Sequence, residues 1–172
     1  ATVVSAILFT FVFEYPGGIA NEFLGSMHIG LQNWLSPTSF LVYFSIIFAD
    51  SWKTTPIMIL ILYSGMLRVP QELYYAASVD GAGPIRRFFS ITIPNIRSFI
   101  AVSLLIRGIS EFNIFALPLI LVGYNPPFLT TLTYELFSSG ISIYLSYATA
   151  TVLLAIVSVF IFIVLKIGGG RR

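Results

Sequence analysis

Long apolar stretches alternate with polar segments along the chain, and this pattern predicts helices that cross a membrane. Segments 40–67, 98–122 and 145–167 are each long enough to cross a hydrocarbon core of about 30 Å as a helix. The apolar run at 1–13 would extend over only about 20 Å as a helix. We interpret it as the truncated end of a spanning helix, which would make the chain the C-terminal portion of a larger membrane protein.

Composition supports the same class. Hydrophobic residues make up 57% of the 172 residues and charged residues 9%, and the mean hydropathy is +0.93, whereas soluble proteins carry about 25% charged residues. Because so few charged residues cannot cover the surface of a water-soluble domain, we expect an all-α integral membrane protein. The absence of cysteine excludes disulfides, zinc fingers and iron–sulfur clusters.

The basic residues predict how the helices are oriented. The segments 14–37 and 123–144 separate apolar runs and contain no Lys or Arg, so we expect them to be outer loops, each with a short helix, and Trp34 to be an interfacial anchor. The loop 68–97 and the C-terminus are basic, which places both in the cytoplasm by the positive-inside rule. Seven cations carry this signal: Arg68, Arg86, Arg87, Arg97, Lys166, Arg171 and Arg172.

The basic loop 68–97 is expected to form two short helices joined by a sharp turn. Pro70 suits the first turn of a helix, Gly81 and Gly83 end that helix, and Pro84 suits the start of the next one. The first helix is rich in small residues, which permit close approach by a partner protein.

The same loop resembles the EAA loop of the permease subunits of binding-protein-dependent ABC importers. The positions that match this pattern are Ala76, Ala77, Gly81, Phe88, Ile91 and Pro94. The stretch from Glu72 to Ala82 is similar to the carbohydrate branch of the family. Further resemblance covers most of the chain, including GGIANEFL, Trp52-Lys53 and FNIF, and points to the F-type subunits of maltose transport.

The resemblance implies the helical bundle of an importer transmembrane domain, with a coupling helix that contacts an ATPase subunit. The glutamate of the family's EAA triplet is replaced by Tyr75, and Glu72, three residues earlier on nearly the same helix face, is a candidate to compensate. A helix that merely covers its own bundle is the alternative. The residues assigned to coupling are Glu72, Tyr75, Ala76, Ala77, Asp80, Gly81, Ala82 and Phe88.

Two of the spans contain charges. Counted along the helices, Asp50, Lys53, Arg107 and Glu111 lie roughly 20–25 Å from the cytoplasmic ends and form one layer. Each costs at least ~2.5 kcal/mol near the midplane, so they need partners or water. They can pair within each helix or between the two helices, which would be structural, or line a hydrated path in which Trp52 stacks on a sugar; these interpretations are compatible.

In relatives that this chain resembles, the helices on either side of the loop contact the sugar, at positions that match residues in this same layer. Kinks at Pro56 and Pro118 are expected to open a cavity there. Together the charges and the resemblance define the predicted substrate path: Asp50, Trp52, Lys53, Thr54, Ile57, Arg107, Ser110, Glu111, Asn113 and Ile114.

Catalytic chemistry is not expected from this chain. It contains no GxxxxGK[ST] phosphate loop, and its one histidine, His28, has no clustered ligand or catalytic partner. We therefore expect no metal or cofactor in the chain, ATP and Mg²⁺ being bound by two partner ATPase subunits. The other expected partners are a second permease subunit, an extracellular sugar-binding protein, the sugar and membrane lipid, but not nucleic acid.

The predicted function is the membrane-spanning subunit of a sugar importer in the cell membrane. One alternative is an importer of the same type for a non-sugar solute such as a polyamine. A second alternative is an ion-coupled secondary transporter in which Asp50 and Glu111 bind the coupling ion.

Overall fold

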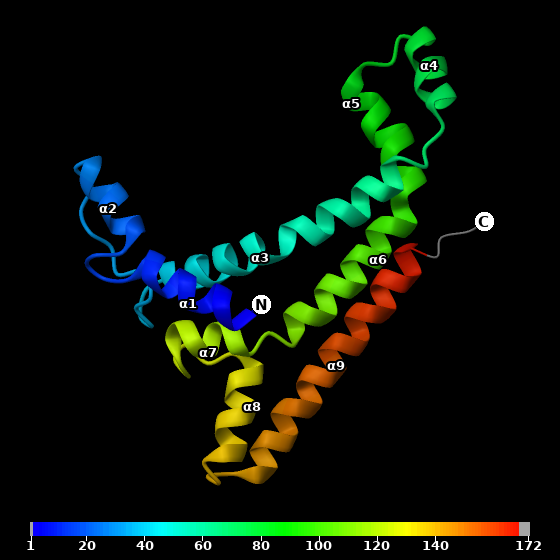
Figure 1. Ribbon diagram of the computed structural model, residues 1–172. Coiled ribbons are helices and arrows are strands. Elements are labelled where there is room, and N and C mark those ends of the chain that lie inside the picture. Colours follow the sequence, from blue (N-terminus) through cyan, green and yellow to red (C-terminus); the bar gives the residue numbers. More distant parts are fainter. Residues whose placement is uncertain (1, 169–172) are drawn as a thin grey trace. The chain divides into compact units, whose positions relative to one another are not determined.

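The computed structural model describes residues 2–168, and this part of the chain is helical without β-strands (Figure 1), which confirms the all-α prediction. The helices follow one another as α1 Thr2–Phe13, α2 Ile19–Ser26, α3 Leu41–Met66, α4 Gln71–Val79, α5 Pro84–Arg87, the π-helix η1 Phe88–Thr92, α6 Ile93–Phe112, α7 Ala116–Val122, α8 Leu129–Ser138 and α9 Ile143–Gly168.

Three of the described helical segments have the length and hydropathy to cross a membrane: Leu41–Met66, Pro84–Phe112 and Ile143–Lys166. The first and the third occupy the stretches expected at 40–67 and 145–167. The 12 residues of α1 are too few to cross a bilayer by themselves.

The second span differs from the helix expected over 98–122. Helix α6 ends at Phe112, and α7 is a separate helix that begins at Ala116. Pro118 explains the break, because it has no N–H to donate to the carbonyl of Ile114 and its ring would clash with that carbonyl in a continuous helix. It lies instead in the first turn of α7, where proline is tolerated.

The start of this span is also earlier than expected. Helix α5, the π-helix η1 and α6 follow one another without a gap from Pro84, so the second arm of the loop predicted at 68–97 continues directly into the membrane helix. Helix α3 is continuous through Pro56, which lies inside it.

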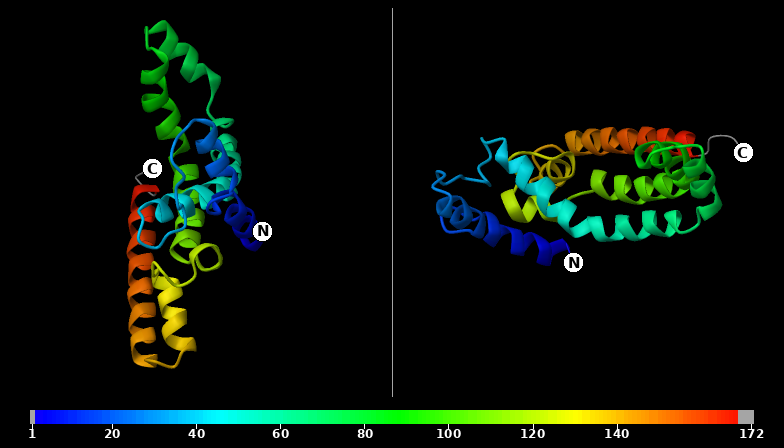
Figure 2. Two further views of the ribbon diagram at one scale, coloured as in Figure 1. Left: turned by 90° about the vertical axis from the view of Figure 1, so that its left-hand side faces the viewer. Right: turned by 90° about the horizontal axis from the view of Figure 1, so that it is seen from above.

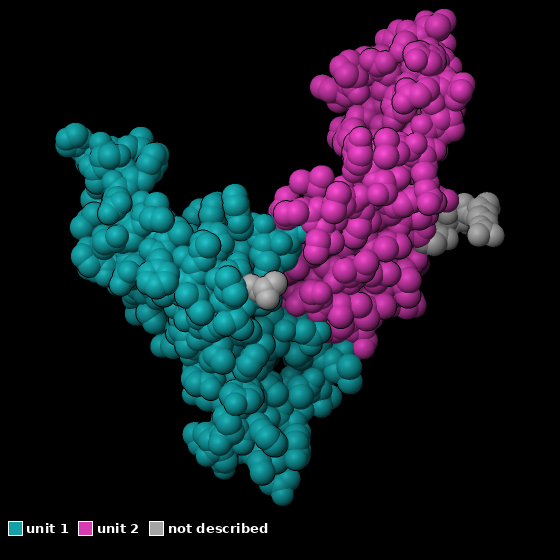
Figure 3. All heavy atoms as spheres, in the orientation of Figure 1, with its two compact units in different colours: residues 1–54, 112–156 teal, residues 55–111, 157–172 magenta. Residues whose placement is uncertain are grey.

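The described residues divide into two compact units, shown in different colours in Figure 3. Unit 1 contains the described residues up to Thr54 together with 112–156, and unit 2 contains 55–111 and the described residues from 157 onward. In unit 1 a buried apolar core joins α1, the first half of α3 and α7. Its members are Ala6, Phe9, Phe13, Val42, Ile46, Ala49, Leu117 and Leu121.

The loop between α1 and α3 is organised around Asn21, which is fully buried. Its amide nitrogen donates to the carbonyls of Glu14 (3.3 Å) and Gln32 (3.0 Å). Its amide oxygen accepts from the backbone N–H of Gln32 (2.9 Å) and from the indole N–H of Trp34 (3.1 Å). The Trp34 ring also packs against Phe13, with ring centroids 5.7 Å apart. Trp34 thus closes the loop onto the core.

Unit 2 is held together by close contacts between glycines and aromatic rings. A Cβ atom added at Gly65 of α3 would lie 2.6 Å from Cγ of Phe99 on α6, and one at Gly108 of α6 would lie 2.1 Å from the ring of Phe160 on α9. Figure 2 shows the later turns of α9 beside α6. Small residues at these crossings let the helices approach closely, as is common in membrane proteins.

Candidate functional sites: intramembrane ion pairs and a helix–turn–helix loop

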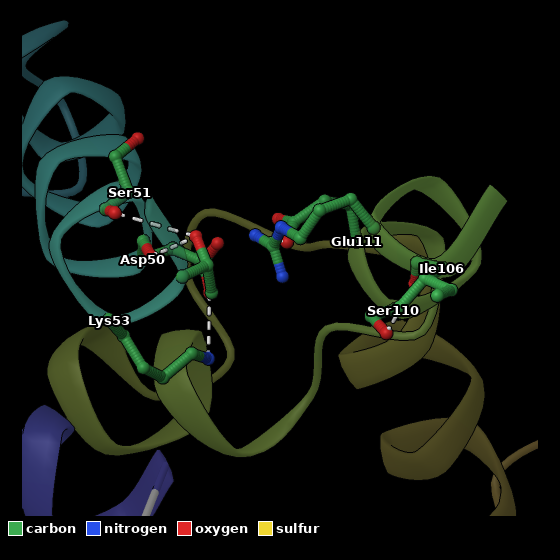
Figure 4. Close-up of polar contacts among 8 residues, drawn as sticks. Asp50, Ser51, Lys53, Ile106, Ser110 and Glu111 are labelled. Carbon is green, nitrogen blue, oxygen red and sulfur yellow. Dashed lines mark hydrogen bonds and ion pairs between the residues drawn. The ribbon is translucent and has the colours of Figure 1, made fainter. Parts of the chain in front are cut away.

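The charges of α3 form an ion pair within the helix. The ammonium group of Lys53 lies 2.8 Å from Oδ1 of Asp50, one turn earlier (Figure 4). Asp50 is buried and Lys53 is half-buried. The hydroxyl of Thr54, also buried, donates to the backbone carbonyl of Asp50 at 2.7 Å. Pairing lowers the cost of placing these charges inside a membrane.

The charges of α6 form a second pair, between Arg107 and Glu111 at i,i+4. The side chain of Arg107 exposes 19% of its surface, and that of Glu111 exposes 41%. Ser110 lies on the exposed side of the helix and donates its hydroxyl to the carbonyl of Ile106 at 2.8 Å (Figure 4). The two intrahelical pairs considered from the sequence therefore both form.

The remaining members of the predicted substrate path differ in accessibility. Trp52 and Ile57 on α3 present exposed side chains, at 70% and 57% of their full surface. Asn113 and Ile114 lie in the break between α6 and α7. The carbonyl of Ile114, which Pro118 cannot engage, accepts the hydroxyl of Thr130 from α8.

A hollow that the sequence did not reveal lies beside this break in unit 1. It measures about 560 Å³, and it is lined by aromatic rings, hydroxyl groups, one amide and two aliphatic side chains: Asn113, Phe115, Thr130, Thr133, Tyr134, Phe137, Ser146, Tyr147, Ala150 and Leu153. Of the residues in the predicted substrate path, Asn113 lines this hollow. Rings together with hydroxyls suit a ligand with apolar faces and hydrogen-bonding edges.

The loop between α3 and α6 has the predicted helix–turn–helix structure. Helix α4 ends at Val79, and Gly81 adopts the left-handed conformation, with φ of 75°. The turn returns hydrogen bonds to the helix, from the N–H of Gly81 to the carbonyl of Ser78 (3.1 Å) and from that of Ala82 to the carbonyl of Ala77 (2.9 Å). Glycine adopts this conformation without the steric cost that a side chain would add. Pro84 begins α5 as expected.

Two side-chain hydrogen bonds tie the arms of the loop together. The guanidinium of Arg87 on α5 donates to the hydroxyl of Ser78 on α4 at 2.7 Å. The hydroxyls of Tyr74 on α4 and Thr92 on the π-helix lie 2.8 Å apart. The sequence did not predict either bridge, because Ser78 and Arg87 are nine residues apart and Tyr74 and Thr92 are 18 residues apart.

The first arm of the loop presents apolar and polar side chains outward. No described residue of α4 is buried, and Tyr75 and Val79 expose 69% and 88% of their surfaces. Glu72 is exposed as well. An apolar surface of this kind on a short helix is typical of a protein–protein contact.

Comparison with known proteins places this architecture in a family. Residues 2–167 match the family described as the binding-protein-dependent transport system inner membrane component. The trehalose/maltose transport system permease protein MalF of Thermococcus litoralis is 35% identical over 178 residues, covering 99% of this chain and 59% of that protein.

The sulfoquinovosyl glycerol transport system permease protein SmoG of Agrobacterium fabrum is 34% identical over 127 residues, covering 74% of this chain and 41% of that protein. This chain therefore spans about half the length of the curated relatives it matches. A crystal structure of a bacterial ABC transporter involved in the import of the acidic polysaccharide alginate has a similar fold, with a TM-score of 0.72, 20% identity, and coverage of 98% of this chain and 60% of that one.

The family match covers the core of unit 1, the ion pairs and the helix–turn–helix loop alike. The chain belongs to the family of binding-protein-dependent transport system inner membrane components, which are transport permeases.

Proposed function

We propose that this chain is the translocating part of a permease subunit of an ATP-driven importer, and that the transported solute is a sugar. The observation that carries the proposal is the match over residues 2–167 to a permease family, with a trehalose/maltose permease as a relative along 99% of this chain. A sulfoquinovosyl glycerol permease is a second sugar-related relative.

In this proposal α4 and its turn are the coupling element that contacts a separate ATPase subunit. The exposed Tyr75 and Val79 supply the apolar contact surface, and Glu72 supplies a charge on the exposed side of the helix. Because α5, η1 and α6 continue from the turn without a gap, a displacement of the loop would reach Arg107 and Glu111 through one helix. The π-helical turn lies on this route, and such turns are frequent at functional sites.

The solute path in this proposal uses the predicted layer on α3 and α6. Trp52 offers an exposed ring for stacking on a sugar. Lys53, Glu111 and Asn113 offer hydrogen-bonding groups. The ion pairs lower the cost of placing the charges of α3 and α6 in the membrane.

The proposed assembly contains a second permease subunit, two ATPase subunits and an extracellular binding protein. The family name itself refers to a binding protein. The alginate transporter whose structure was solved in complex with an alginate-bound periplasmic protein has the same fold, with a TM-score of 0.73. ATP and Mg²⁺ are bound by the ATPase subunits, and the basic loop and the C-terminus face the cytoplasm with them.

The proposal is tested with the full-length subunit and its partners reconstituted in liposomes. We expect ATP hydrolysis to rise when binding protein loaded with trehalose or maltose is added, and radiolabelled sugar to enter only when ATP is supplied. Uptake driven by an ion gradient without ATP would contradict the proposal. Stimulation by a polyamine-loaded binding protein, with no response to sugars, would retain the importer and reject the sugar.

A further inference from the structure

Unit 2 has a groove of about 450 Å³ that the transport proposal does not use. It lies between the last turns of α3 and the first half of α6. The residues that line it are Ile61, Ser64, Arg68, Ser98, Phe99 and Val102.

Polarity changes along the length of this groove. Ile61 lies on α3, and Arg68 lies in the turn that follows it, two residues beyond the end of the candidate span Leu41–Met66. On α6, which runs in the opposite direction, Val102 lies four residues beyond Ser98, or about 6 Å farther along the helix. The polar residues Arg68 and Ser98 therefore lie toward the end of the groove nearer the loop that joins the two helices, and the apolar residues Ile61 and Val102 lie toward the other end.

Phe99 lines the groove and packs against Gly65 of α3. The missing side chain of Gly65 lets the ring of Phe99 lie against α3. The guanidinium carbon of Arg68 lies 5.2 Å from the centre of that ring. A ring face engages one flat side of the guanidinium and leaves its N–H edges able to bind an anion. Within residues 2–168 the contact of Arg68 is thus with a ring and not with a carboxylate.

We propose that this groove binds one anionic phospholipid. The phosphodiester binds the N–H edges of Arg68, with the exposed hydroxyl of Ser98 at the same end, and an acyl chain follows Ile61 and Val102 into the membrane. Basic pockets between membrane helices are suited to such head groups. The polar end of the groove therefore suits the head group of the lipid, and the apolar end suits its acyl chain. This inference rests on the membrane location of the family and not on the transported solute.

The test uses the purified transporter containing the full-length subunit, studied by native mass spectrometry during titration with phosphatidylglycerol. We expect one tightly retained phosphatidylglycerol per subunit, and about fivefold weaker retention in Arg68→Gln, the effect of one cation near a membrane surface. Lys166→Gln is the matched control, because it removes another exposed cation of unit 2 that does not line the groove. Its retention of the lipid should stay within twofold of the wild type.

A second variant, Val102→Trp, fills the apolar end while keeping Arg68. It should also reduce lipid retention, which separates the groove from a purely electrostatic attraction. Phosphatidylcholine and inorganic phosphate serve as comparison ligands, and both should bind more weakly than phosphatidylglycerol.

Several outcomes would overturn the proposal. These are equal retention in wild type and Arg68→Gln, equal retention of phosphatidylcholine, displacement of the lipid by inorganic phosphate, or no retained lipid at all because another segment of the complex covers the groove. Lipid retention does not depend on the transport assay, so failure of sugar uptake with normal lipid binding would reject the transported solute alone.

Discussion

Unit 1 and unit 2 are stabilised in different ways. Unit 1 has a buried apolar core between α1, α3 and α7, and its loop between α1 and α3 is closed by four hydrogen bonds to the buried Asn21. In unit 2 the helices meet at glycine–aromatic crossings such as Gly65–Phe99, and its loop is tied by two exposed or half-buried bridges. Helix α4 has no buried residue.

The difference indicates a division of roles. A segment that stays folded on its own contacts is suited to be a scaffold, whereas a segment with exposed apolar surface is suited to exchange contacts with a partner. Unit 2 contains both the loop that we propose to contact the ATPase and the groove that we propose to bind lipid. If this comparison is correct, changes in the apolar core and the Asn21 loop of unit 1 should act on stability, and changes in the loop of unit 2 should act on transport.

The largest effect on transport is expected from Gly81→Pro. Proline requires φ near −65°, whereas Gly81 has φ of 75° and donates its N–H to Ser78. The turn cannot form, so ATP-driven uptake should fall at least about 100-fold, since mispositioned coupling parts lose rates on this scale, while the amount of protein in the membrane stays normal. Uptake by reconstituted vesicles and quantitative immunoblotting measure the two quantities.

Gly83→Ala is the matched control for this change. Gly83 has extended backbone and no heavy atom within 4 Å of an added Cβ, so uptake should remain near normal. Normal uptake in Gly81→Pro would refute the coupling role of the turn.

In unit 1 the largest loss of stability is expected from Asn21→Leu. The substitution leaves the carbonyls of Glu14 and Gln32 and the indole N–H of Trp34 without the buried amide that they contact, which should cost about 3 kcal/mol. Thermal unfolding of the purified transporter measures the change. Asn21→Asp keeps the acceptor oxygen for Gln32 and Trp34, but it replaces the donor to the carbonyls of Glu14 and Gln32 with a second acceptor oxygen in a fully buried position, so its loss should also be large. A loss below about 1 kcal/mol in Asn21→Leu would show that these hydrogen bonds do not determine loop stability.

A smaller loss is expected from Lys53→Met, which removes the cation beside the buried Asp50. Breaking a buried pair from one side destabilises a protein by several kcal/mol, and since Lys53 is half-buried, we expect about 2 kcal/mol. The double variant Asp50→Asn, Lys53→Met removes both charges and should recover much of the loss in the same unfolding assay. A double variant that is less stable than Lys53→Met would contradict this account.

The smallest effect on stability is expected from Ser78→Ala, which removes two exposed hydrogen bonds, one accepted from Arg87 and one donated to the carbonyl of Tyr74. The loss should be below about 1 kcal/mol. Transport should nevertheless fall relative to ATP hydrolysis, because only the contact between Tyr74 and Thr92 would then tie the two arms of the loop together. The ratio of sugar imported to ATP hydrolysed measures this. An unchanged ratio would show that the bridge does not transmit force.

The sequence predicted the spans best where the apolar run was long and uniform. It predicted the turn at Gly81 and the helix start at Pro84 equally well, because glycine and proline restrict the backbone locally. The second span was placed wrongly, over 98–122. Pro118 was recognised as a disturbance, but whether a proline bends a helix or divides it depends on what satisfies the freed carbonyl, here the hydroxyl of Thr130 on α8.

The sequence by itself determined the membrane class, the all-α fold and the family, because these follow from composition, the lengths of apolar runs and a local motif. Tertiary structure decided which distant residues meet: Asn21 with Trp34, Thr130 with Ile114, and Phe99 with Gly65. Each of these contacts depends on the path of the intervening backbone. The direction of that path is set by packing of whole helices, which the type and spacing of the contacting residues do not specify.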